Sequence, residues 1–114
     1  MTKTYIVTGG GGFIGSHLVE RLLREGNRVR VVDNFLTGSR ANLDGMTGDL
    51  EVCEVSITDR AALDAAFAGA EVVFHQAALP SVPRSVADPL TTHDINVTGT
   101  LNVLMAARDA HVRR

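Results

Sequence analysis

The sequence is poor in tryptophan, tyrosine and cysteine, with none, one and one of these among its 114 residues. Because Cys53 is the single cysteine, no disulfide can form within the chain, which excludes a disulfide-stapled scaffold and favours a reducing compartment. No apolar run approaches the roughly 20 residues that a membrane-spanning helix needs, and no secretory signal is expected at the start of the chain. We therefore expect a cytoplasmic protein without a membrane partner.

Clusters of positive charge and of metal ligands are also lacking. The 11 lysine and arginine residues are scattered among 13 acidic ones, and the net charge is −2. We therefore expect no nucleic-acid partner. The four histidines show no close pairing of metal-ligand type, so surface or packing roles are expected for them and no metal site. They are His17, His75, His93 and His111.

Short apolar runs rich in valine and isoleucine alternate with helical patterns along most of the chain. The runs are Thr4–Thr8, Arg28–Val32, Glu51–Val55 and Val72–Gln76. This alternation predicts an α/β fold, a partial Rossmann fold with a parallel sheet of about four strands. We expect the strand order 3-2-1-4, right-handed crossovers, flanking helices and a ligand site at the carboxyl ends of the strands.

The segments between the strands show helical periodicity or turn residues. Ile14, Leu18 and Leu22 recur at four-residue spacing and predict the first helix. Thr58 is expected to cap the second. The other predicted elements are a helix over Asp59–Ala68, a loop over Asn34–Asp49 with a turn around Arg40–Leu43, a proline-rich loop over Leu79–Thr92 with a short helix near Pro83, and a long helix from about Thr92 to Ala110.

A glycine-rich segment joins the first strand to the first helix. It reads Thr8-Gly9-Gly10-Gly11-Gly12-Phe13-Ile14-Gly15. Glycines at a strand-to-helix turn let the backbone approach a pyrophosphate, which the N-terminus of the helix attracts. The alternative is a flexible structural turn, but Asp33 ends the second strand, where a carboxylate can bind the ribose hydroxyls and repel a 2′-phosphate. NAD is therefore favoured over NADP, with the reservation that Arg40 lies in the following loop.

Several separated motifs together resemble the extended short-chain dehydrogenases, the family of NAD-dependent epimerases and dehydratases. They are the glycine segment through Leu18, Asp33-Asn34 with Thr37-Gly38, Phe74-His75-Gln76-Ala77-Ala78, and Asn96-Val97-Thr98-Gly99-Thr100. Within the family, the proline-rich loop with Asp88-Pro89 is most similar to bacterial 4-epimerases that act on UDP-N-acetylglucosamine or UDP-glucose. The resemblance implies NAD as the cofactor and a UDP-sugar as the substrate of the complete enzyme.

The resemblance also implies roles for individual residues. The pyrophosphate would contact Gly9, Gly12, Phe13, Ile14 and Gly15, and the adenosine ribose with its neighbouring phosphate would contact Asp33, Asn34, Thr37 and Gly38. Ser56 and Ile57 would flank adenine, although the family usually has an aspartate in place of this serine. The nicotinamide side would be lined by Ala77, Ala78 and Leu79, with Asn96 nearby. Ser81, Val82 and Ser85 would lie near the sugar nucleotide, with helix capping as the alternative for the serines.

The resemblance places the catalytic machinery of the family beyond Arg114. A Tyr-x-x-x-Lys pair and a substrate domain would follow there, whereas this chain has only Tyr5 and Lys3. We therefore expect residues 1–114 to be a truncated NAD-binding domain without catalytic residues, in which Asn96 has at most a supporting role. Three possibilities remain open: the cofactor-binding part of an epimerase or dehydratase, a free-standing NAD-binding module, and an inactive truncated or engineered chain.

A sheet that ends at Val72–Gln76 would leave that apolar edge open. Unpaired strand edges invite pairing with another chain. We therefore expect a homo-oligomer, with exchange of strands between copies as one form of it.

Overall fold

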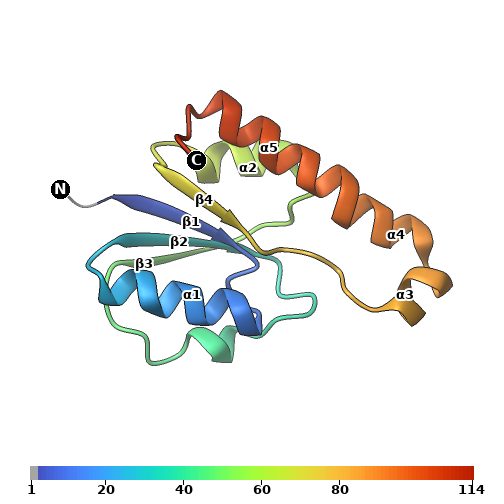
Figure 1. Ribbon diagram of the computed structural model, residues 1–114, viewed down its shortest axis with the longest axis horizontal. Coiled ribbons are helices and arrows are strands. Elements are labelled where there is room, and N and C mark those ends of the chain that lie inside the picture. The colour runs from blue at the N-terminus through green and yellow to red at the C-terminus, as the bar shows by residue number, and fades with distance from the viewer. Residues whose placement is uncertain (1–2) are drawn as a thin grey trace.

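Runs of β-branched residues form four parallel strands, as the computed structural model of residues 3–114 shows (Figure 1). The strands are β1 (Thr4–Thr8), β2 (Arg28–Asp33), β3 (Leu50–Glu54) and β4 (Val72–His75). They pair in the order β3-β2-β1-β4. This order confirms the predicted topology, and each observed strand lies within one residue of its predicted bounds.

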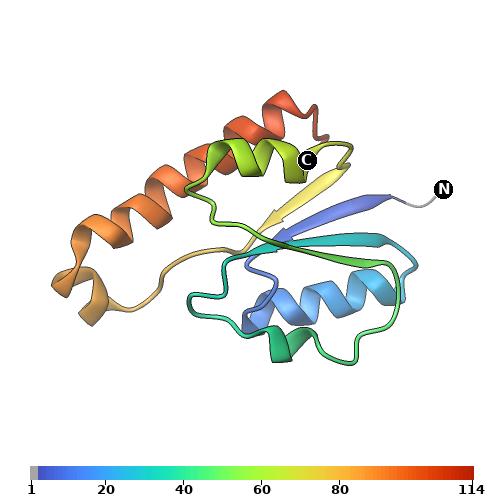
Figure 2. The ribbon, with the colours of Figure 1, turned by 180° about the vertical axis from the view of Figure 1, so that it is seen from behind.

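Helices cover both faces of the sheet. In chain order they are α1 (Phe13–Arg24), the 3₁₀ helix η1 (Arg40–Leu43), α2 (Arg60–Phe67), α3 (Val82–Ala87), α4 (Pro89–His93), the π-helix η2 (Asp94–Thr98) and α5 (Gly99–Asp109). Figures 1 and 2 show α1 and η1 on one face, and α2 and α5 on the other. The helical run from α3 to α5 extends past the carboxyl ends of the strands.

Successive side chains along each strand point to opposite faces of the sheet, so the apolar core is divided between these two faces. In β1, Val7 packs toward α1 and its neighbour Ile6 packs toward α2 and α5, and both are fully buried. Leu63 and Phe67, one turn apart on α2, are fully buried against the same face as Ile6. Because both faces of the sheet are covered, its strands consist largely of apolar residues.

The predicted cap of α2 was wrong by one residue. Asp59, not Thr58, is the N-cap, and its carboxylate accepts a hydrogen bond of 3.2 Å from the Ala62 N–H. Thr58 is engaged elsewhere, because its hydroxyl lies 2.7 Å from the hydroxyl of Ser56. Two residue types that cap helices well stand side by side here, and Asp59 is the one whose side chain caps α2.

The predicted long helix near the C-terminus is not uniform. A π-helical turn over Asp94–Thr98 precedes the regular α-helix Gly99–Asp109. The two short helices before it have no buried residues, and Ser81 at the start of α3 has a positive φ of 105°. Helix α4 was not predicted as a separate element. π-turns inside helices are rare overall, and those that do occur are often found at functional sites.

The outer edge of β4 is partly covered, which corrects the expectation that it is open. The Arg113 N–H donates to the Glu71 carbonyl at 2.9 Å, and the Val73 N–H donates to the Arg114 carbonyl at the same distance. The end of the chain therefore lies beside the first half of β4. In the part of the chain that the structure describes, no helix is long and apolar enough to cross a membrane.

The core assignment predicts a difference between two leucines. Leu63→Ala should lower the free energy of unfolding by about 2–5 kcal/mol, because Leu63 is fully buried on α2. The matched change Leu104→Ala should cost less than about 0.5 kcal/mol, since Leu104 on α5 is 63% exposed. Urea unfolding followed by circular dichroism measures both values, and equal losses would contradict the assignment.

Candidate functional site

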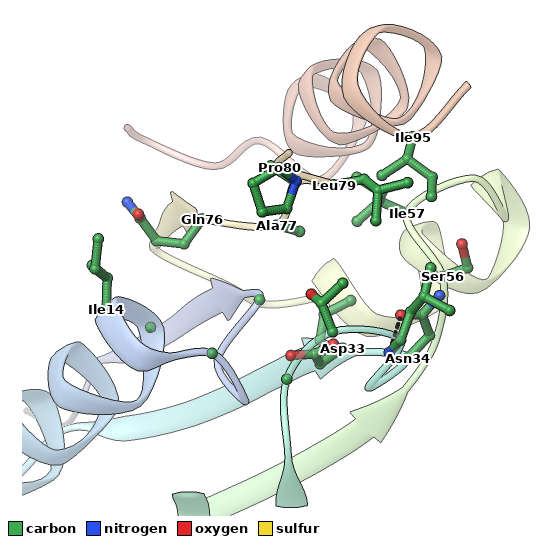
Figure 3. Close-up of a pocket in the computed structure, with 18 of the residues that line it drawn as sticks. Ile14, Asp33, Asn34, Ser56, Ile57, Gln76, Ala77, Leu79, Pro80 and Ile95 are labelled. Carbon is green, nitrogen blue, oxygen red and sulfur yellow. Dashed lines mark hydrogen bonds between the residues drawn. The ribbon is translucent and has the colours of Figure 1, made fainter. Parts of the chain in front are cut away.

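A cavity of about 490 Å³ lies at the carboxyl ends of the strands (Figure 3). The chain leaves β1 toward one face of the sheet and β4 toward the other, so this is the switch point where open α/β sheets bind ligands. The cavity is lined by Gly9, Gly12, Phe13, Ile14, Gly15, Val32, Asp33, Asn34, Leu36, Thr37, Gly38, Val55, Ser56, Ile57, Gln76, Ala77, Ala78, Leu79, Pro80 and Ile95. Every predicted cofactor-binding residue except Asn96 is among them.

The glycine segment brings backbone against backbone. A Cβ added at Gly15 would lie 2.2 Å from the Gly9 carbonyl oxygen, and one at Gly9 would lie 2.7 Å from the Ala77 nitrogen. Gly9 also has a positive φ of 71°. Helix α1 therefore starts directly over the end of β1, and its N-terminus has no side-chain cap and no acidic residue in its first turn. Such a helix start attracts anions.

Asp33 joins the glycine segment to the loop that follows β2. One carboxylate oxygen accepts a hydrogen bond of 2.8 Å from the Gly11 N–H, and the other accepts one of 2.8 Å from the Phe35 N–H. The Gly11 carbonyl accepts from the amide of Asn42 at 2.8 Å. Each carboxylate oxygen has a further lone pair, so Asp33 can also accept from hydroxyl groups in the cavity.

Arg40 is held by two contacts, although the sequence left open whether it turns toward the ribose site. Its guanidinium donates to Glu54 at 3.1 Å and lies 4.6 Å from the centre of the Phe35 ring. Arg40 does not line the cavity. Both contacts are at the surface, where each is worth at most about 1 kcal/mol.

Asn96 lies behind the cavity and fixes part of its wall. Its side-chain oxygen accepts from the Leu79 N–H at 2.7 Å, and its side-chain nitrogen donates to the Leu79 carbonyl at 3.0 Å. Leu79 is 3% exposed and lines the cavity. Asn96 sits in the π-helical turn, so the residue in the family motif acts here on the shape of the wall.

The three residues predicted to lie near the sugar nucleotide are outside the cavity. The Ser81 hydroxyl accepts from the Arg84 N–H at 3.3 Å, and the Ser85 hydroxyl donates to the Val82 carbonyl at 2.7 Å. Val82 is 76% exposed. Ser81 therefore has the capping contact of the alternative interpretation, whereas Ser85 lies inside α3 and bonds back to the preceding turn. Contact with a sugar nucleotide remains a prediction for all three.

Six lining residues were missed by the sequence analysis. They are Val32, Leu36, Val55, Gln76, Pro80 and Ile95. Each is adjacent in sequence to a predicted site residue, and for Val32, Val55 and Gln76 the carboxyl end of a strand was the usable signal. The side chains of Ser56 and Thr58 bond to each other at 2.7 Å, which the sequence pattern did not indicate.

No group of three potential metal ligands occurs among residues 3–114. Tyr5 packs edge-to-face on Phe74, with ring centres 6.1 Å apart, within the sheet. Neither Tyr5 nor Lys3 lines the cavity.

The fold and the position of the cavity define a doubly wound α/β domain of the Rossmann type. Residues 5–114 match the NAD dependent epimerase/dehydratase family, and the chain belongs to this family. Family membership confirms the resemblance that the sequence motifs indicated.

Relatives with known names are enzymes of nucleotide sugars. A UDP-N-acetyl-alpha-D-glucosaminuronate decarboxylase of Bacillus cytotoxicus is 37% identical over 94% of this chain and 33% of its own length. A putative UDP-glucose 4-epimerase of Methanocaldococcus jannaschii is 42% identical over 90% of this chain and 33% of its own length. The chain thus spans about a third of the curated relatives it matches.

A solved structure shares the fold closely. The UDP-glucose 4-epimerase of Thermus thermophilus, in complex with NAD, superposes with a TM-score of 0.85. It is 41% identical, and the match covers 96% of this chain and 35% of that chain.

The glycine contacts predict unequal effects of two alanine substitutions. Gly15→Ala should lower the free energy of unfolding by about 1–3 kcal/mol, because the added methyl group meets the Gly9 carbonyl and the backbone must shift. Gly12→Ala is the matched control, since its Cβ meets only that carbonyl, at 3.3 Å, and its loss should stay below about 1 kcal/mol. Chemical denaturation tests this order, and a smaller loss for Gly15→Ala would contradict it.

Proposed function

We propose that this chain is the NAD-binding portion of a nucleotide-sugar 4-epimerase. The observation that carries the proposal is the cavity at the switch point of the sheet, where the glycine segment and Asp33 face the same space. Its volume of about 490 Å³ is in the range of ligand pockets, roughly 300–1,000 Å³. The NAD-bound epimerase of Thermus thermophilus supports the choice of cofactor.

The residues present fit a dinucleotide. The close backbone contacts of Gly9 and Gly15 leave no room for side chains, and the uncapped start of α1 faces the place where a pyrophosphate would bind. Gly12, Phe13 and Ile14 would complete that site. The first backbone N–H groups of α1 would donate hydrogen bonds to the phosphate oxygens.

The remaining wall residues would hold the two nucleoside ends. Asp33 would accept from the adenosine ribose, with Asn34, Thr37 and Gly38 beside it, and Ser56 and Ile57 would flank adenine. Ala77, Ala78 and Leu79 would line the nicotinamide side, with Leu79 fixed by Asn96. When bound, NAD would accept a hydride from the sugar and return it.

The reaction of the whole protein is part of the proposal. Epimerisation at C4 of a UDP-sugar is supported by the two epimerases, at 42% and 41% identity, against 37% for the decarboxylase. In a complete enzyme, Ser81, Val82 and Ser85 would lie on the substrate side of the loop after β4. Dehydration remains the alternative that the family description includes.

Calorimetric titration with NAD and NADP tests the proposal. We expect saturable binding of NAD and much weaker binding of NADP, because the Asp33 carboxylate repels a 2′-phosphate. Asp33→Asn should weaken NAD binding about tenfold or more through loss of a charge-assisted hydrogen bond, and should narrow the difference between the cofactors. Absence of NAD binding by correctly folded protein, shown by circular dichroism, would refute the proposal.

The cellular location of the protein and its self-association are further parts of this proposal. A cytoplasmic location is supported by the single cysteine, Cys53, which leaves the chain without an internal disulfide. Self-association is supported by three apolar side chains of η2 and α5 that are at least half exposed. They are Val97, Leu101 and Leu104, at 54%, 54% and 63%.

Sedimentation velocity at several concentrations checks the self-association. We expect a concentration-dependent shift toward a dimer, and Leu101→Lys should shift the equilibrium back to the monomer because it places a charge in the apolar face. Glu20→Lys on α1, away from this face, is the matched control and should leave the equilibrium unchanged. A monomer at all concentrations would contradict the expectation.

A further inference from the structure

A chain of hydrogen bonds runs behind the cavity through the buried hydroxyl of Thr8. This oxygen accepts from the Ala77 N–H at 3.1 Å and from the Gln76 N–H at 3.0 Å, and the Gln76 N–H also donates to the Thr8 carbonyl at 3.1 Å. It also lies 2.7 Å from Nδ1 of His75. Thr8 is fully buried, so no water competes for these contacts.

The direction of the bond between Thr8 and His75 follows by elimination. A hydroxyl has two lone pairs and one proton, and two backbone N–H groups already point at the Thr8 oxygen. The Ala77 N–H faces one lone pair and the shared Gln76 N–H faces the other, which directs the hydroxyl proton to an unprotonated Nδ1 of His75. Nε2 of His75 lies 3.0 Å from the Thr100 hydroxyl, and that hydroxyl donates to the Asn96 carbonyl at 2.7 Å. The proton of neutral His75 therefore sits on Nε2 and points at Thr100.

The chain joins the two sides of the cavity wall. At one end, the N–H of Ala77 belongs to a lining residue whose backbone touches Gly9. At the other end, Asn96 holds the lining residue Leu79 through its side chain. His75 is the only titratable group in this chain of bonds.

We propose that neutral His75, protonated on Nε2, is a positioning residue that holds the nicotinamide side of the cavity in its binding shape, and that protonation of His75 weakens cofactor binding. This inference rests on the function proposed above. Protonated His75 would turn a second N–H toward Thr8, whose oxygen would then face three donors. The hydroxyl would then lose its bond to Ala77 or its share of the Gln76 N–H, directly behind the cavity.

The surroundings of His75 favour its neutral form. The groups that face its ring are the hydroxyls of Thr8 on β1 and Thr100 on α5, and neither is charged. Burial lowers the pKa of His75 below its ordinary value of 6.5, and no charged side chain contributes to this shift. The folded state is therefore stabilised by neutral His75 above about pH 6.5, and this contribution is lost as the pH falls through the lower folded pKa.

Nitrogen-15 NMR of the imidazole rings tests the tautomer without any cofactor. We expect His75 to show an unprotonated Nδ1 and a protonated Nε2 at pH 8. His17 is the internal control, because its Nδ1 lies 2.7 Å from the Phe13 carbonyl, which can only accept, so this nitrogen should carry the proton. A proton on Nδ1 of His75 at pH 8 would overturn the proposal.

Cofactor titrations between pH 8 and pH 5 test the consequence for binding. The dissociation constant of NAD for the wild type should be constant above about pH 7 and should rise as His75 is protonated. His75→Asn should lose this dependence, because its side-chain oxygen accepts from Thr8 without titrating, and at pH 8 it should bind more weakly than the wild type because it lacks the bond to Thr100. His75→Phe should bind about tenfold more weakly at every pH, because it leaves the Thr8 hydroxyl without an acceptor.

The results of these titrations distinguish a failure of the role proposed for His75 from a failure of the proposed NAD binding. Parallel pH curves for the wild type and His75→Asn would overturn the role of His75 while leaving NAD binding intact. If the wild type does not bind NAD at pH 8, the proposed function is refuted, and so is the proposed effect of His75 protonation on NAD affinity. Urea unfolding of the wild type and His75→Asn between pH 8 and pH 5 then still tests the chain of bonds, because only the wild type should lose the His75 contribution.

Discussion

Close contact between backbones at the end of β1 is the constraint on which the rest of the site depends. Gly9, Gly15 and Ala77 approach one another so closely that no side chain fits between them. This contact sets the start of α1 over β1 and brings the loop after β4 beside the glycine segment. The cavity exists because the chain leaves these two neighbouring strands toward opposite faces of the sheet.

The parts of the molecule that could be predicted from sequence depend on local chemistry. A strand needs a run of apolar residues, and the glycine segment needs residues without Cβ atoms, so both were visible in the order of residues alone. Because parallel strands place their carboxyl ends at one edge, the residues that follow each strand could also be assigned to one site. For this reason, most of the residues that line the cavity could be predicted from the sequence.

The features that were missed depend on contacts between distant residues. The cap of α2 falls on Asp59, and the hydroxyl of Thr58 bonds to Ser56 instead. The pairing of Arg113 beside β4 has no signal in a short polar sequence. Likewise, the hydrogen bond between Asn96 and Leu79 and the one between His75 and Thr100 join segments that only the folded chain brings together. The preference of a residue type for a helix, strand or turn does not indicate which distant residue it will contact.

The central position of β1 has a consequence for synthesis of the protein. Its neighbour β2 follows after one helix, but its other neighbour β4 lies about three times as far along the chain, and α5 comes later still. On the ribosome, the face of the sheet that carries Ile6 is therefore not fully covered until both α2 and α5 have emerged, whereas the face that carries Val7 is covered early by α1. The nascent chain thus carries an apolar surface until α5 has emerged, and its exposure to chaperones or to aggregation is set by the order of its strands.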